Sequence, residues 1–415
     1  MTYQPNPTVS IGGTDYTGRT IESVQITRGR QTVYEEPRAG YAMIRIIDVD
    51  DNNLGFAVGA DVQVTAETSA GSAVPLFTGR VSDWSASVEA ALDGPVIRYS
   101  VTCVGPLAIL NRRNVLAAGR PSEDDGARVA AAIGEGLPTP WDEYSATQTW
   151  AQAGQVTWDT VDPGYDPALI DPGVYTLTAL GSATAGYSAL NVVNDASLSA
   201  KGLLYETGDG FIGYADADRR PDNAAAGFLD IPYTSLAVGG LSLNSSLSDV
   251  TNRVTVTYGT ADLSVTQQDD FSIGEYGLQE TTLTTILADQ SDAEARAEDL
   301  LFSQAQPSVE FDALTVNLRS NIGTALRDAL LQVEANDAVN VTGLPEKVGF
   351  QTLGFRGFVE GITFRVSDFD ATVSLFVSDE NLSFGSVLWG QVGGTIVWNA
   401  VGTALTWADA RRVTV

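Results

Sequence analysis

The sequence predicts a mainly β fold with an α+β insertion. Apolar and polar residues alternate with period two up to about residue 105 and again from about residue 246, and helix-type patterns gather between these regions. At roughly 100–200 residues per domain, 415 residues allow two to four domains. We expect a first β domain at 1–108, an α/β insertion at 109–245, a second β domain at 246–380 and a short β-rich extension at 381–415.

Four short runs that alternate with period two lie before residue 105. They are separated by clusters of Gly, Pro, Asn and Asp, as short antiparallel strands are. The runs cover residues 21–27, 42–48, 62–66 and 97–103. This spacing is typical of a small β-barrel or sandwich.

The insertion carries helix signals. Ser122 precedes an acidic turn and is expected to cap a helix that ends near Gly134 or Gly136. A second helix is expected at 188–201, followed by a hairpin at 203–214 with a Gly-Asp-Gly turn. The aromatic and Pro-rich stretch 138–175 has little periodicity, so we interpret it as an excursion loop or an irregular β segment.

The second β region resumes the alternation. One helix interrupts it, beginning at a capping box formed by Ser291 and Glu294. Strands are expected at 252–258, 309–314, 355–364 and 371–377.

A Phe-x-Gly-x-Val pattern occurs twice, at 77–81 and at 355–359. Each copy stands near the end of a β region and is followed by alternating residues. We interpret the pair as the trace of a duplicated β domain.

A second repeat lies in the extension, where Trp389, Trp398 and Trp407 recur every nine residues. Strand-turn units in which each tryptophan packs on the next turn produce this spacing, and so does a flat aromatic contact surface.

Composition excludes several kinds of chemistry. The chain has no histidine and one cysteine, Cys103, which rules out His-dependent nucleophiles, His-ligated metals and an intramolecular disulfide. No phosphate-binding glycine loop is present. Carboxylates remain, but 52 acidic residues make any close pair uninformative. We expect no catalytic, cofactor-binding or metal-binding residues.

Charge excludes a reader of duplex DNA. The formal net charge is −29, and such a reader needs a basic footprint. The arginine pairs at 112–113, 219–220 and 411–412 are interpreted as surface salt-bridge partners of acidic neighbours.

The acidic run from Asp48 to Asp51 offers oxygen atoms at alternate positions, as calcium loops do. Asn53 stands where the helix-loop-helix calcium motif has Gly, and Gly59 where it has Glu. A polar turn is therefore favoured, and a calcium ion remains the alternative.

No membrane insertion is expected. Residues 1–19 are polar and lack the pattern of a signal peptide. Residues 381–407 contain no charge over 27 positions, but they are rich in Gly, Ser and Thr and poor in Leu and Ile.

A series of loosely matching segments runs from about residue 20 to 380. They are 24–30, 42–48, 76–81, 104–110, 202–206, 209–212, 249–256, 276–278 and 292–301. In this order they resemble the tail hub proteins of long-tailed bacteriophages, also called minor tail or baseplate hub proteins, especially those of siphophages that infect actinobacteria.

This resemblance implies two similar small β-barrels separated by an α/β domain, assembled as a homotrimer. Its pseudo-sixfold ring would adapt the sixfold tail tube to the threefold tip of the virion. The implied partners are the distal tail protein, tail tube and tape-measure proteins, and receptor-binding or central fibre proteins. DNA would pass through without specific binding, and acidic residues lining the channel would repel its phosphates.

We expect a structural, non-enzymatic protein, assembled in the host cytoplasm. The extension at 381–415 would be specific to its group of phages and would dock a neighbouring tip protein or fold back on the hub. Three alternatives remain open: a hexameric distal tail protein, a carboxylate-based cell-wall glycosidase, and a glycan-binding adhesin that uses the three tryptophans.

Overall fold

The computed structural model describes residues 7–380, except for 18–19, 34, 49–55, 92–93, 138–165, 245–246, 262, 308–309, 345–353 and 368–369. The extension with Trp389, Trp398 and Trp407 lies outside the described residues. Most of the aromatic stretch, and the acidic run beyond Asp48, lie outside them too.

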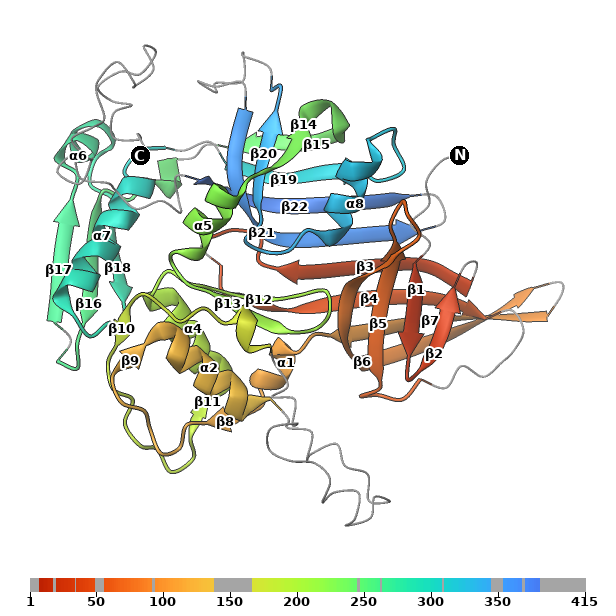
Figure 1. Cartoon of the computed structure of the whole chain (residues 1–415), viewed down its shortest axis with the longest axis horizontal. Coiled ribbons are helices and arrows are strands. Elements are labelled where there is room, and N and C mark those ends of the chain that lie inside the picture. The colour runs from red at the N-terminus through yellow and green to blue at the C-terminus, as the bar shows by residue number, and fades with distance from the viewer. Residues whose placement is uncertain are drawn as a thin grey trace.

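A sheet of 13 strands forms the centre of the molecule, with its N-terminal strands at the lower right of Figure 1. The N-terminal strands are antiparallel to their neighbours. In sheet order they are β3 (Ile21–Gly29), β4 (Arg38–Asp48), β7 (Gly94–Val104), β6 (Ala73–Ala91), β5 (Asp61–Glu67), β1 (Thr8–Ile11) and β2 (Thr14–Thr17).

The predicted alternation places one face of each strand in the core. In β4, Ala42, Ile44 and Ile46 are fully buried, whereas Tyr41 and Met43, which point to the opposite face, are exposed. Burying each large aliphatic side chain contributes about 1.5–3 kcal/mol. The pattern therefore determines which face of this strand packs inward.

The C-terminal strands continue the sheet in the upper part of Figure 1. In order they are β15 (Leu236–Asn244), β19 (Glu310–Asn317), β22 (Ala371–Asp379), β21 (Gly354–Ser367), β20 (Ala338–Thr342) and β14 (Leu229–Pro232). β14 is parallel to β20, and the other pairs are antiparallel. Helix α8 (Thr324–Gln332) buries Leu330 and Leu331 in the same core.

The two parts join where β21 pairs with β3. Val366 lies opposite Val24 and Phe364 opposite Ile26, and all four side chains belong to one shared hydrophobic core. The described strands form this continuous sheet and no closed barrel. The mainly β prediction is confirmed, and two separate barrels stay a prediction.

The insertion lies at the lower left of Figure 1, where α2 and α4 pack together. Its helices are α1 (Leu107–Leu110), α2 (Asp125–Gly136), α4 (Ala189–Ser199) and α5 (Arg219–Ala226), with a 3-10 turn at Pro167–Leu169. Its short strands are β8 (Asn114–Val115), β9 (Glu123–Asp124), β10 (Thr176–Leu177), β11 (Tyr187–Ser188), β12 (Leu203–Glu206) and β13 (Ile212–Ala215). The predicted hairpin is β12 and β13, paired from Leu203 opposite Ala215.

A three-stranded sheet stands at the far left of Figure 1. It contains β16 (Arg253–Tyr258), β17 (Leu263–Gln268) and β18 (Glu280–Thr284), with α6 (Asp270–Tyr276) and α7 (Gln290–Gln304) beside it. Val254 and Val256 share a hydrophobic cluster with Leu204 and Val193 of the insertion. Packing therefore groups this segment with the insertion, and the boundaries drawn along the chain remain a prediction.

Two helix starts differ from expectation. α2 begins at Asp125, because Ser122 donates its hydroxyl to the carbonyl of Leu177 and does not cap the helix. α7 begins at Gln290, one residue before the predicted cap Ser291. The helix expected at 188–201 is α4, and Ser188 caps it by accepting a hydrogen bond from the Asn191 backbone. Within the described part of the chain, no helix is long and apolar enough to cross a membrane.

Candidate functional site

The two Phe-x-Gly-x-Val segments occupy matching places in the main sheet. Gly79 lies in β6 opposite Val62 of β5, and Gly357 lies in β21 opposite Val339 of β20. Around them the strand order repeats: β3-β4-β7-β6-β5 corresponds to β15-β19-β22-β21-β20. The sheet therefore contains the same five-strand unit twice.

Both glycines are required for the same reason. A Cβ added at Gly79 would overlap the carbonyl oxygen of Val104 in β7 and stand 2.7 Å from the ring of Phe77. A Cβ added at Gly357 would overlap the carbonyl oxygen of Ser378 in β22 and stand 2.9 Å from the ring of the phenylalanine two positions earlier. The sequence repeat thus marks a shared steric need, a close approach of backbone and aromatic ring.

A bulge follows each glycine at the same interval. The register shifts between Val81 and Asp83 in β6, and between Val359 and Gly361 in β21. Beyond the bulge, β21 pairs with β3, whereas Asp83 to Glu89 of β6 have β7 on one side and no described strand on the other. The two units differ here in what covers their edge.

The bulge residue of β21, Glu360, is the centre of a buried charge network. Its carboxylate accepts hydrogen bonds from Arg30 Nε at 2.7 Å, Arg220 Nη2 at 2.7 Å and Ser378 Oγ at 2.6 Å. Burial alone would raise the pKa of Glu360, but the two arginines lower it to about 2. Glu360 therefore ties α5 of the insertion and the end of β3 to the junction of the sheet.

A second buried carboxylate, Glu206 at the end of β12, joins the hairpin to the sheet. Its oxygens accept hydrogen bonds from the backbone of Gly40 at 2.7 Å and of Leu107 at 2.6 Å. Gly40 and Gly105 leave room for it, because a Cβ at either position would overlap the carboxylate. Burial raises the pKa of Glu206 to about 7, although the two backbone N–H groups and Arg28 favour the charged form.

The hairpin turn rests on the repeated segment of β6. Arg28 donates to the carbonyl of Glu206 at 3.0 Å and pairs with Glu334, whose other oxygen accepts from Gly208 N at 3.0 Å. Thr78, inside the first Phe-x-Gly-x-Val segment, donates to the Gly208 carbonyl at 3.0 Å. The insertion is thus held against both five-strand units.

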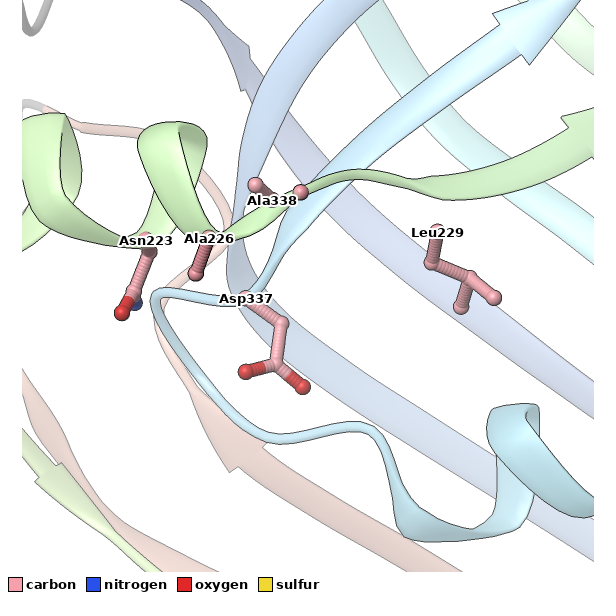
Figure 2. Close-up of a pocket in the computed structure, with 6 residues that line it drawn as sticks. Asn223, Ala226, Leu229, Asp337 and Ala338 are labelled. Carbon is pink, nitrogen blue, oxygen red and sulfur yellow. The ribbon is translucent and has the colours of Figure 1, made fainter.

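A pocket of about 270 Å³ opens where α5 ends and β14 and β20 begin (Figure 2). Its lining is Asn223, Ala226, Gly227, Leu229, Asp337 and Ala338. Asp337 is the one carboxylate among these residues, and it accepts a hydrogen bond from Glu334 N at 2.9 Å. Glycoside hydrolysis needs two carboxyl groups about 5–9.5 Å apart, which this lining does not supply.

The structure also locates the acidic residue Asp48 and the arginine pair at 219–220. Asp48 is 3% exposed, and among the described residues no group of three or more acidic or cysteine side chains is placed to hold a metal. Arg219 pairs with Asp171, as expected of the arginine pairs. Arg220, in contrast, is not a surface residue, because its partner is the buried Glu360.

Sequence reasoning missed Glu206 and Glu360. Glu206 follows the run from Leu203 to Tyr205, and Glu360 follows the run from Gly357 to Val359. An uncharged run of this kind directly before it is unusual for a solvated acid. That pattern was the available signal, since a carboxylate on a buried run must find partners.

The solved structures that share this fold include two tail proteins. The 43 kDa tail protein of prophage MuSo2 from Shewanella oneidensis is 14% identical with a TM-score of 0.58, over 91% of this chain and 100% of that one. A tail protein from Neisseria meningitidis MC58 is 12% identical with a TM-score of 0.59, over 92% of this chain and 98% of that one. No family profile and no curated protein matches the sequence.

Proposed function

We propose that this chain is a structural protein of a bacteriophage tail tip. Three copies would form a pseudo-sixfold ring, the hub, that adapts the sixfold tail tube to a threefold tip and lines the DNA channel. The observation that supports this most directly is the five-strand unit that occurs twice in one sheet. Two of the solved structures that share the fold are tail proteins, which supports the same assignment.

Two like units in one chain suit a symmetry adaptor. Three chains present six similar units to a sixfold neighbour, while the rest of each chain repeats three times and matches a threefold neighbour. A hexamer of a single-unit protein makes six equivalent contacts without a duplication. The duplication therefore favours the hub over a hexameric distal tail protein.

The net charge of −29 suits a channel that DNA must pass through without binding. Acidic residues on the inner wall would repel phosphates at distances up to about 10 Å at 0.1 M salt. We place the distal tail protein, tube and tape-measure proteins on one side of the ring, and receptor-binding or fibre proteins on the other. The protein would act in the virion, without catalysis, after assembly in the host cytoplasm.

The experiment is native mass spectrometry of the purified chain across a range of concentrations. We expect trimers. Hexamers would instead favour the distal tail protein. A monomer at every concentration would count against the hub and call for assays of peptidoglycan clearing and glycan binding.

A further inference from the structure

Four strand edges of the main sheet have no neighbour among the described residues. The outer edges of β2 and β14 are only four residues long, and the other two edges are longer. One belongs to residues 83–89 of β6, on the side away from β7. The other is the outer edge of β15, which pairs only with β19 and ends the sheet. Figure 1 places β15 near the top and β6 at the lower right, so one copy cannot pair its own two edges.

Between Asp83 and Glu89, the β6 edge carries no charged residue and no proline. Trp84 is 39% exposed and Val88 is 69% exposed, both on the same face. The equivalent residues of β21 are Ile362 and Val366, which are 1% and 7% exposed because β3 and the core cover them. Natural proteins usually protect long edge strands with charges, prolines or a covering element.

The internal junction supplies a template for the missing neighbour. β21 and β3 pair antiparallel with Val366 opposite Val24. The counterpart of Val366 is Val88, because both lie five positions beyond the shifted residue of the bulge, Asp83 or Gly361.

The counterpart of Val24 follows from its neighbours across the sheet. Val24 lies opposite Ile44 in β4, which lies opposite Val101. Leu241 lies opposite Leu314 in β19, which lies opposite Leu375. Leu241 of β15 therefore corresponds to Val24 of β3.

We propose that residues 83–89 of β6 pair with β15 of a second copy of this chain, antiparallel, with Val88 opposite Leu241. Each chain then gives one edge and receives the other, a head-to-tail contact that forms a ring when the rotation between copies closes after three chains. The number of copies rests on the proposed hub, and the new element is the pair of strands that joins neighbouring chains. This pairing between chains has the same geometry as the pairing of β21 with β3 within one chain.

Disulfide crosslinking of the full chain tests the register. The double variant Val88→Cys with Leu241→Cys should give covalent trimers on a non-reducing gel, at least tenfold more than Glu89→Cys with Leu241→Cys. Glu89 is the matched control, because side chains of neighbouring strand residues point to opposite faces. The native Cys103 is fully buried, and burial raises its pKa to about 12, so its thiol does not compete.

The outcomes separate this inference from the proposed function. Native trimers without the covalent bond would overturn the strand pairing and leave the hub intact. Covalent hexamers would support the pairing and contradict the trimer. Uncrosslinked monomers at every concentration would contradict both.

A charge placed in the edge gives a second test. Val88→Lys should raise the concentration needed for assembly at least tenfold without changing the Tm of the unassembled chain, since Val88 is exposed in the single chain. Leu198→Lys is the control, because Leu198 is 51% exposed and lies in α4, outside the main sheet. Equal assembly of the two variants would overturn the proposal.

Discussion

Gly79 and Gly357 are structural equivalents separated by 278 positions, each pressed between a neighbouring strand's carbonyl and the ring of the phenylalanine two residues before it. The carbonyls belong to Val104 and Ser378, which are themselves equivalent positions of β7 and β22. A shared need at both places explains why this short pattern persists in two units with little other likeness.

A methyl group at either glycine should destabilise the fold to a similar degree. Gly79→Ala and Gly357→Ala force the Cβ into a backbone carbonyl that cannot rotate away, and overpacking of this kind costs about 1–3 kcal/mol. Urea denaturation of each variant measures the loss. Gly181→Ala is the control, because nothing lies within 4 Å of its added Cβ. A loss at only one of the two sites would contradict their equivalence.

Glu360→Gln should destabilise the junction of the sheet by about 3–5 kcal/mol at pH 7, because it leaves two buried arginines without their counter-charge. Removal of an exposed partner, as in Glu89→Gln, should cost less than about 1 kcal/mol. Denaturation of both variants at one pH provides the comparison. Equal effects would show that the network contributes no more than a surface pair.

The same carboxylate gives a pH dependence of known sign. The folded-state pKa of Glu360 is about 2, below its ordinary value of 4.5, so its stabilising contribution is complete above pH 4.5. The contribution is lost as the pH falls toward 2. The difference in unfolding free energy between wild type and Glu360→Gln should therefore shrink as the pH falls from 4.5 to about 2. Denaturation of both proteins at a series of acidic pH values measures this difference. A constant difference would contradict the depressed pKa.

Glu206 should give a pH dependence of stability opposite in sign to that of Glu360. Its folded-state pKa of about 7 exceeds its ordinary 4.5, so its contribution is complete below pH 4.5 and is lost as the pH rises through 7. Between pH 4.5 and pH 8, Glu206→Gln should gain stability relative to wild type by roughly 3 kcal/mol. Urea midpoints of the two proteins over this range measure the gain. If Glu206→Gln instead gained stability relative to wild type as the pH fell, the raised pKa of Glu206 would be wrong.

The chain should not retain duplex DNA. Counterion release supplies most non-specific DNA affinity, and a formal charge of −29 opposes it. Gel-shift experiments at both 50 mM and 200 mM salt should show no complex. A complex that weakens steeply with added salt would reveal a basic surface that the net charge conceals.

Local patterns predicted local structure well. Alternation located β3, β4, β7 and β22, because each strand buries one face and the period is a property of the chain itself. The Gly-Asp-Gly turn located the hairpin, and the Phe-x-Gly-x-Val repeat located the duplicated unit.

The sequence did not predict which distant strands pair with each other. β3 and β21 are more than 300 residues apart, and the sequence of neither strand indicates that it pairs with the other. The packing of β16 and α7 on the insertion was missed for the same reason. Glu206 and Glu360 were missed because composition alone treats an acid as solvated, whereas their burial depends on hydrogen-bond partners that are distant in the sequence.

Cryo-electron microscopy of the purified assembly tests the hub most directly, because it counts chains and units together. We expect rings of three chains that look sixfold at the level of the main sheet and threefold at the insertion. Rings of six identical chains, or particles without a ring, would contradict it.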